Sequence, residues 1–290
     1  MALASMSEIF ERMVRNGQEF WEVVLADDMD ERQVSREASM AKMLTTWQAM
    51  QDAADSYTGR KRSVSGLVGG DGMKMRQYTF RGCAMTGGYV SEVIAEALSM
   101  AESNACMRRI VAAPTAGACG VLPAVLLPLC KYEELTQHQL LEALYVAAGI
   151  GSVIAYKASI AGASGGCQAE IGSASAMAAA GLAYLQGGDD EQIVNAMAFA
   201  LKNMLGLTCD PVCGLVEVPC IKRNSAGAVN AVTSAQMALA GVCSAIAPDE
   251  VIDTMRRIGN ALPACLKETS EGGLATTPSA QKVREKMDGE

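Results

Sequence analysis

Aromatic residues and histidine are scarce in this sequence. Only 4% of the 290 residues are aromatic and one is histidine, although 50% are apolar. The apolar content comes from Ala, Met, Leu and Val rather than from aromatic or β-branched runs, which favours helix over strand. No alternating strand pattern of useful length is present, and no Pro/Ser/Gly-rich linker divides the chain. We therefore expect an all-α fold, formed as a single compact multi-helix domain over residues 1–290.

Long apolar runs and a secretion signal are also missing. The longest clean apolar run, Val121–Cys130, contains two prolines and is well short of the ~20 residues that span a bilayer. The first residues lack a basic segment followed by an apolar block. A formal charge of −8 disfavours nucleic acid and anionic membranes as partners. These features predict a cytoplasmic protein, whose ten cysteines are buried thiols or metal ligands rather than disulfides.

The cysteine spacing does not fit zinc, because no C-x₂-C pair is present and histidine is almost absent. Instead, Cys209, Cys213 and Cys220 lie within Asn203–Ser225, where two prolines and two glycines prevent one continuous helix. An irregular buried loop needs partners for its backbone polar groups. A cluster with many acceptor atoms, bound by cysteine thiolates, would provide them. Cys167 lies in another glycine- and serine-rich turn upstream.

Three segments resemble signature segments of the iron–sulfur-dependent L-serine dehydratases, α chain of the two-subunit type. They are GGCQAEIGSASAMAAAGLA, NMLGLTCDPVCGLVEVPCIKRN and AAPTAGACGVLPAVL. GLVGGDGMKM and ETSEGGLATTP also fit, so the resemblance covers roughly Ser56 to Pro278. It implies that Cys167, Cys209 and Cys220 bind a 4Fe–4S cluster. Cys213 is then a neighbour of the cluster rather than a ligand. The other six cysteines are scattered on or near apolar helices and are expected to be buried structural thiols; they are Cys83, Cys106, Cys119, Cys130, Cys243 and Cys265.

The resemblance implies a lyase that converts L-serine to pyruvate and ammonia, in amino-acid catabolism and gluconeogenesis. Three ligands on a four-iron cluster leave one iron open, and that iron would act as a Lewis acid on the leaving hydroxyl. Two alternatives stay open. One is a related lyase acting on threonine or cysteine, since one methyl group discriminates by only ~1–3 kcal/mol. The other is a non-catalytic iron–sulfur sensor. Whether the enzyme also needs a monovalent cation as a second cofactor is not determined by the sequence.

The segment Ala112–Gly120 reads as a turn with accessible amides followed by a helix. Because amides at a helix N-terminus attract anions, Thr115, Ala116 and Gly117 are the candidates for binding the substrate carboxylate. A tight helix–helix turn is the alternative interpretation. The glycine-rich stretch Ser56–Gly82 is expected to be a loop, either a solvated surface loop or a lid near the site.

The general base has no strong candidate in this sequence. The single histidine, His138, lies in the first turn of an expected helix and reads as exposed and inert. Lys157 and Lys222 flank the cysteine segments and are weak candidates for the base, with charge compensation of the cluster as the preferred role. Single-chain relatives carry a second domain with a Ser-Ser-His-Thr stretch, which this chain lacks. The resemblance therefore implies a separate β subunit that completes the active site.

The helical pattern predicts about nine helices. Ser7–Leu25 and Asp30–Ala54 are expected to form an N-terminal hairpin within residues 1–55. Thr136 and Gln139 form a capping box for a long helix, Asn224 is expected to cap a helix running to Gly241, and Pro248 is expected to start another. The polar tail after Pro278 is expected to fray.

Overall fold

The computed structural model describes residues 3–289, and these residues form thirteen α-helices with short 3₁₀ and π segments. Outside helices they form no strand, only an isolated bridge between Cys209 and Lys267. The expected all-α fold is confirmed. The α-helices are α1 (Met6–Asn16), α2 (Phe20–Arg32), α3 (Arg36–Asp55), α4 (Asp71–Phe80), α5 (Gly87–Ala105), α6 (Val121–Tyr132), α7 (Gln137–Lys157), α8 (Gly162–Gly165), α9 (Ser173–Leu185), α10 (Asp190–Asn203), α11 (Cys220–Leu239), α12 (Pro248–Ala261) and α13 (Pro278–Asp288).

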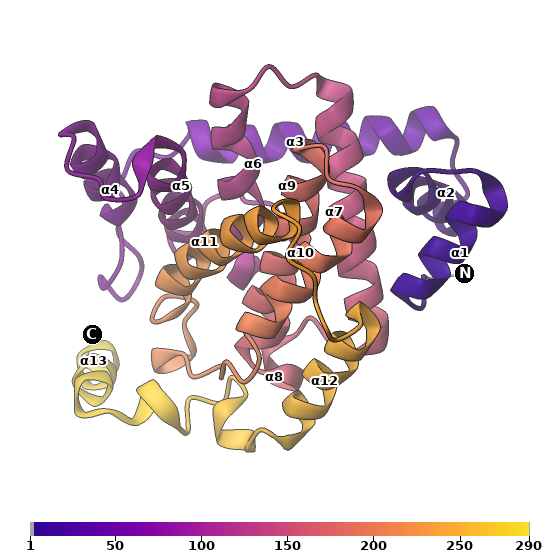
Figure 1. Cartoon of the computed structure of the whole chain (residues 1–290). Helices are drawn as coiled ribbons and strands as arrows, with labels where there is room; N and C mark the ends of the chain where they lie inside the picture. The colour runs from indigo at the N-terminus through magenta and orange to yellow at the C-terminus, as the bar shows by residue number, and fades with distance from the viewer. Residues whose placement is uncertain (1–2, 290) are drawn as a thin grey trace.

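Helix α9 lies in the middle of the molecule, where it packs against α6, α7, α10 and α11 (Figure 1). Every residue from 173 to 183 is buried. A helix that is apolar or small on all sides is the expected centre of a helical core. The sequence SASAMAAAGLAYL therefore predicts burial on every face rather than an amphipathic surface helix.

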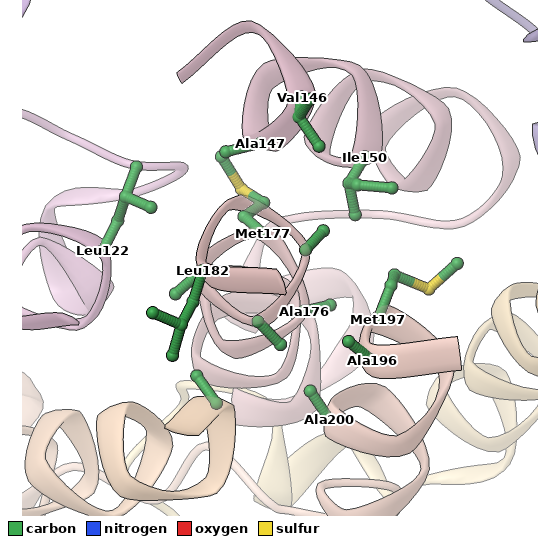
Figure 2. Packing of buried hydrophobic residues seen from close by; sticks show 14 of the residues in the cluster. Leu122, Val146, Ala147, Ile150, Ala176, Met177, Leu182, Ala196, Met197 and Ala200 are labelled. Carbon is green, nitrogen blue, oxygen red and sulfur yellow. The ribbon is translucent and has the colours of Figure 1, made fainter. Parts of the chain in front are cut away.

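Small side chains let the core helices approach closely. A Cβ on Gly181 of α9 would stand 3.2 Å from the carbonyl oxygen of Ala143 in α7. Figure 2 shows larger side chains filling the space between α9, α7 and α10, namely Met177, Val146, Ile150 and Met197, while Leu182 points to the other side of α9. Alanines make the other contacts between these helices, and an added methyl group at an alanine would clash with neighbouring side chains because the interior is tightly packed.

Helix α7 has the length and apolar content of a membrane-crossing helix, against the expectation that no segment would reach this length. Within the fold, 67% of its apolar window is buried against other helices, chiefly α9 and α2. Its start is confirmed, because Thr136 and Gln139 make both hydrogen bonds of the capping box. The start of α12 at Pro248 is confirmed as well.

The N-terminal hairpin was wrong in detail, because residues 6–55 form three helices instead of two. Gly17 ends α1 in the left-handed conformation with φ of 64°. Glu19 and Glu22 then form a capping box that starts α2. The left-handed C-terminal residue and the new cap together break the expected Ser7–Leu25 helix.

The stretch Ser56–Gly82 is a loop only as far as Gly70, because α4 follows it. The buried carboxylate of Glu102 accepts hydrogen bonds from the amides of Gly70 (3.0 Å) and Asp71 (2.8 Å). This carboxylate satisfies free amides at the start of α4. Since it comes from α5, the start of α4 was not visible in the local sequence.

Two further helix boundaries differ from expectation. Helix α11 begins at Cys220 rather than after Asn224. Asn224 is an interior residue of the helix, and its side chain accepts a hydrogen bond from the Gly120 amide instead of capping α11. The tail after Pro278 forms α13, which Thr277 caps by accepting from the Ala280 amide at 3.3 Å. The threonine cap followed by proline at the first helical position is a helix-start signal.

Candidate functional site

Cys167, Cys209 and Cys220 come from three separate segments and lie within electrostatic range of one another. Cys167 lies between α8 and the π segment η2 (Gln168–Gly172), Cys209 lies in the loop after α10, and Cys220 opens α11. Their exposed fractions are 2%, 3% and 8%, and all ten cysteines are free thiols. The expectation that the other cysteines are buried is confirmed for Cys106 and Cys119 but wrong for Cys83, Cys130 and Cys243, which are exposed. Three buried thiols that form no disulfide are available as ligands.

The pKa values show that the three thiols influence one another. Burial raises the pKa of Cys167 to about 11 and that of Cys220 to about 12. Burial also raises the pKa of Cys209, and the negative charges of Cys167, Glu170, Glu268 and Cys220 raise it further. Thiolates in this position need a compensating positive charge.

The backbone around Cys209 is held by a neighbouring segment. Its amide donates to the carbonyl of Leu266 at 2.9 Å, and its carbonyl accepts from the amide of Glu268 at 2.7 Å. Gly162 faces it, and a Cβ there would stand 2.9 Å from the Cys209 Sγ and 3.0 Å from the Glu170 Oε2. Glycine is therefore needed at position 162, and the thiol and the carboxylate lie close to each other across it.

The turn that contains Cys167 is held by the side chain of Gln168, which is fully buried. Its Oε1 accepts from the Gly206 amide at 2.9 Å, and its Nε2 donates to the carbonyl of Met255 at 3.0 Å. Gly166 precedes the cysteine with φ of 78°, a conformation that favours glycine. Gln168 thus joins this turn to the cysteine loop and to α12.

Arg223 supplies the positive charge at the site. It follows Cys220 by three residues on α11, donates to the Thr208 carbonyl at 2.6 Å and pairs with the Asp210 Oδ1 at 2.9 Å. Through its positive charge it offsets part of the burial effect on the pKa of Cys167. The sequence interpretation assigned charge compensation to lysines and missed this arginine.

Thr115, Ala116 and Gly117 lie beside the cysteine site, at the 3₁₀ turn η1 (Ala116–Ala118) before α6. The Thr115 hydroxyl donates to the Glu170 Oε1 at 2.8 Å. A Cβ on Gly117 would stand 3.0 Å from the same oxygen. Ala116 is exposed. Thr115 and Gly117 thus line a carboxylate that reaches towards Cys209 on its other side.

Asn224 ties this turn to the cysteine helix. Its Oδ1 accepts from the Gly120 amide at 2.9 Å, and its Nδ2 donates to the carbonyls of Gly117 (2.8 Å) and Cys220 (3.0 Å). The side chain is 1% exposed. A single buried amide therefore fixes the spacing between the expected substrate segment and Cys220.

Glu170 is a second residue that the sequence interpretation missed. Burial raises its pKa, the Thr115 hydrogen bond lowers it, and Glu268 raises it again. Its position three residues after Cys167 was the only signal in the sequence. Among residues 3–289 no lysine, arginine or histidine pairs with it.

The two candidate lysines have acidic partners outside the cysteine segments. Lys157 pairs with Asp249 at 3.1 Å and with Asp253 at 3.7 Å, which ties α7 to α12. Lys222 is paired with Asp71 at 2.6 Å, which ties α11 to α4. Both interactions serve the packing of helices.

His138 is exposed, as expected, whereas the place of Cys213 beside a cluster stays a prediction. His138 lies 3.2 Å from the carboxylate of Glu142 and packs edge-on against Trp21. Cys213 is half-buried in the 3₁₀ turn η3 (Val212–Gly214) with φ of 55°. It lines an open cleft of about 410 Å³ together with Glu268, Ser270 and Arg284.

The donors do not converge as ligands of one ion do. Within residues 3–289 no three His, Cys, Asp or Glu side chains are grouped tightly enough to hold a single metal ion. A single zinc ion needs its ligands within ~2.0–2.3 Å of one point. The cysteine arrangement is thus not that of a mononuclear site.

Residues 15–275 match the family model described as serine dehydratase alpha chain. The chain is 44% identical over 268 residues to a "Probable L-serine dehydratase, alpha chain" of Bacillus subtilis, covering 92% of this chain and 89% of the relative. It is 37% identical over 283 residues to the "L-serine dehydratase, alpha chain" of Peptoniphilus asaccharolyticus, covering 97% of each. "L-serine dehydratase 2" of Escherichia coli is 49% identical over 181 residues, which are 62% of this chain and 40% of that protein.

Proposed function

The chain belongs to the serine dehydratase alpha chain family, and from this premise we propose that it is the α subunit of an L-serine dehydratase. The reaction would convert L-serine to pyruvate and ammonia. The observation that carries the proposal is the meeting of three buried, unpaired cysteines from distant segments beside one arginine. The lack of any disulfide among the ten cysteines supports work in a reducing compartment such as the cytoplasm.

The three cysteines fit a 4Fe–4S cluster better than a single ion. Cysteine thiolates are the usual ligands of such clusters, and each would bind a different iron atom, so the thiols surround a larger body. This agrees with thiols that influence one another electrostatically without converging on one point. When bound, a cluster with three protein thiolates would offer an open iron as a Lewis acid for the leaving hydroxyl.

The chain's own residues prepare this site. Arg223 places one positive charge against the thiolates, and Asp210 fixes its orientation at 2.9 Å. Gly162 leaves the space between Cys209 and Glu170 free of a side chain. Asn224 holds the Thr115–Gly117 turn against the cysteine helix. Preorganised groups of this kind save reorganisation during the reaction.

We propose that a β subunit supplies the general base. The chain matches only 40% of the length of the single-chain Escherichia coli relative, so most of that protein has no counterpart in the matched segment. His138 is exposed and paired with Glu142. Lys157 and Lys222 stay formal candidates, but their ion pairs with aspartates disfavour a free amine at either position.

The test is to purify the chain under anaerobic conditions, alone and with a co-expressed β chain from the same source, and to assay pyruvate. We expect pyruvate from L-serine with the α–β complex and little with the α chain alone. Full activity of the α chain alone would contradict the β-subunit proposal. A cluster-containing complex that forms no 2-oxo acid from L-serine, L-threonine or L-cysteine would contradict the lyase and favour a sensor. L-Threonine and L-cysteine, assayed in parallel, would give 2-oxobutyrate and pyruvate if either is the better substrate.

A further inference from the structure

Glu170 occupies the space between the cysteine site and the Thr115–Gly117 turn. Its Oε1 accepts from the Thr115 hydroxyl at 2.8 Å. Its Oε2 lies 3.0 Å from the point where a Gly162 Cβ would stand, and the Cys209 Sγ lies 2.9 Å from that same point. One carboxylate therefore touches the expected substrate segment with one oxygen and faces a proposed cluster ligand with the other.

The carboxylate of Glu170 has no cationic side chain as a partner in the part of the chain that the structure describes. Within the described residues it takes part in no ion pair, and one neutral hydroxyl is its only side-chain hydrogen-bond donor. Glu268, exposed on the adjacent loop, adds a second negative charge that acts on it. A half-buried carboxylate without a cation is costly. A cationic ligand group would relieve that cost through charge-assisted hydrogen bonds.

We propose that Glu170 binds the α-ammonium group of the amino-acid substrate and so places its hydroxyl towards the cysteine site. This inference rests on the proposed function, because it assumes that the substrate is an amino acid held beside the three cysteines. Ammonium and carboxylate are complementary in charge, and a free α-amino group is what separates serine from a hydroxy acid of the same shape. Glu170 is thereby a residue that determines substrate class.

The proposal changes the role of the Thr115–Gly117 turn. A substrate carboxylate bound at this turn would lie against Oε1 of Glu170, and like charges in contact are unfavourable. The Thr115 hydroxyl instead orients Glu170, and Gly117 gives the carboxylate room. The substrate carboxylate then lies on a different side of the site.

The experiment compares L-serine with L-glycerate, in which a hydroxyl replaces the ammonium group. The variants are Glu170→Gln, which keeps the shape and the acceptor for Thr115, and Glu170→Asp, which keeps the charge but shortens the side chain. Glu271→Gln removes an exposed carboxylate from the nearby loop and is the matched control. All are measured as the anaerobic α–β complex, with iron content, KM and kcat for L-serine, and glycerate binding followed by the visible spectrum of the cluster.

Glu170→Gln is expected to raise the KM for L-serine by roughly 10- to 150-fold, the factor of one lost charge-assisted hydrogen bond. Iron content and glycerate affinity should stay within about threefold of wild type, a factor that corresponds to less than ~0.7 kcal/mol. The aspartate variant should fall between wild type and the glutamine variant, and Glu271→Gln should match wild type. Wild-type enzyme should bind L-serine more tightly than glycerate.

An unchanged KM for L-serine in Glu170→Gln would overturn the inference. So would equal weakening of serine and glycerate, because a merely structural role affects both ligands. If Glu170→Gln loses its iron, the aspartate variant decides by the same serine-to-glycerate comparison. Wild-type complex without iron or pyruvate would instead overturn the proposed function, so the two failures are distinguishable.

Discussion

The side chain of Asn224 makes hydrogen bonds to both the Thr115–Gly117 turn and the helix that begins at Cys220, so its removal should lower the stability of the chain. Replacing it with alanine deletes an acceptor for the Gly120 amide and a donor to the carbonyls of Gly117 and Cys220. The side chain is 1% exposed, so water cannot readily replace these partners. The substitution Asn224→Ala thus leaves buried backbone groups without bonds.

The magnitude follows from these contacts. A buried amide left without an acceptor costs ~1–3 kcal/mol, and each other lost hydrogen bond costs ~0.5–1.5 kcal/mol. The Cys220 carbonyl also belongs to the hydrogen-bond ladder of the helix, so losing its bond to Asn224 costs the least free energy of the three. We expect Asn224→Ala to lower the free energy of unfolding by about 2–5 kcal/mol.

The assay is urea unfolding of the chain, followed by far-ultraviolet circular dichroism at fixed pH under anaerobic conditions. The slope of free energy against urea should stay as in wild type, so that the midpoint shift reports stability. Thr233→Ala, an exposed residue on the same helix, is the control and should change stability by less than ~0.5 kcal/mol. A loss below ~1 kcal/mol for Asn224→Ala would refute the reasoning.

Three further predictions concern charged and titratable groups. Burial opposes ionisation of Asp249, but hydrogen bonds from the start of α1 and from Lys157 leave its pKa lowered. The ionised carboxylate therefore stabilises the folded chain fully above its ordinary pKa of ~4, and this stabilisation is lost as the pH falls through the lowered pKa. Asp249→Asn should flatten the fall of the unfolding midpoint below pH ~4, and an unchanged acid profile would argue against this. Arg223→Met should hold much less iron per chain than Lys222→Met, because the exposed ion pair of Lys222 is worth at most ~1 kcal/mol. Equal losses of iron in the two variants would contradict the role of Arg223 as the compensating charge. His138→Ala should keep kcat for the α–β complex within about twofold of wild type, less than ~0.5 kcal/mol in barrier height, and a large loss in the pyruvate assay would make His138 the base.

The helical class and most long helices could be predicted from composition and periodicity. Caps written in the local sequence, such as Thr136 with Gln139, also gave the correct start. The break after Gly17 was missed because a glutamate, rather than a serine, threonine or aspartate, caps α2. The start of α4 depends on Glu102, a residue of another helix, so local propensity could not reveal it.

The site could be predicted only in part. The Cys167, Cys209 and Cys220 assignment came from resemblance, and the structure brings these residues into mutual electrostatic range. Arg223 was passed over in favour of its neighbour Lys222. Residues three apart share a helix face and residues two apart do not, so Arg223 joins Cys220 while Lys222 turns to Asp71. That argument required the true start of α11, which was placed too late.

The central claim is that Cys167, Cys209 and Cys220, without Cys213, hold a four-iron cluster. The direct measurement is iron and acid-labile sulfide per chain after anaerobic reconstitution of wild type and of the four single cysteine-to-serine variants. The account predicts about four irons per chain in wild type and in Cys213→Ser, with a large loss in each of the other three. Wild-type iron content in Cys220→Ser, or loss of iron in Cys213→Ser alone, would contradict it.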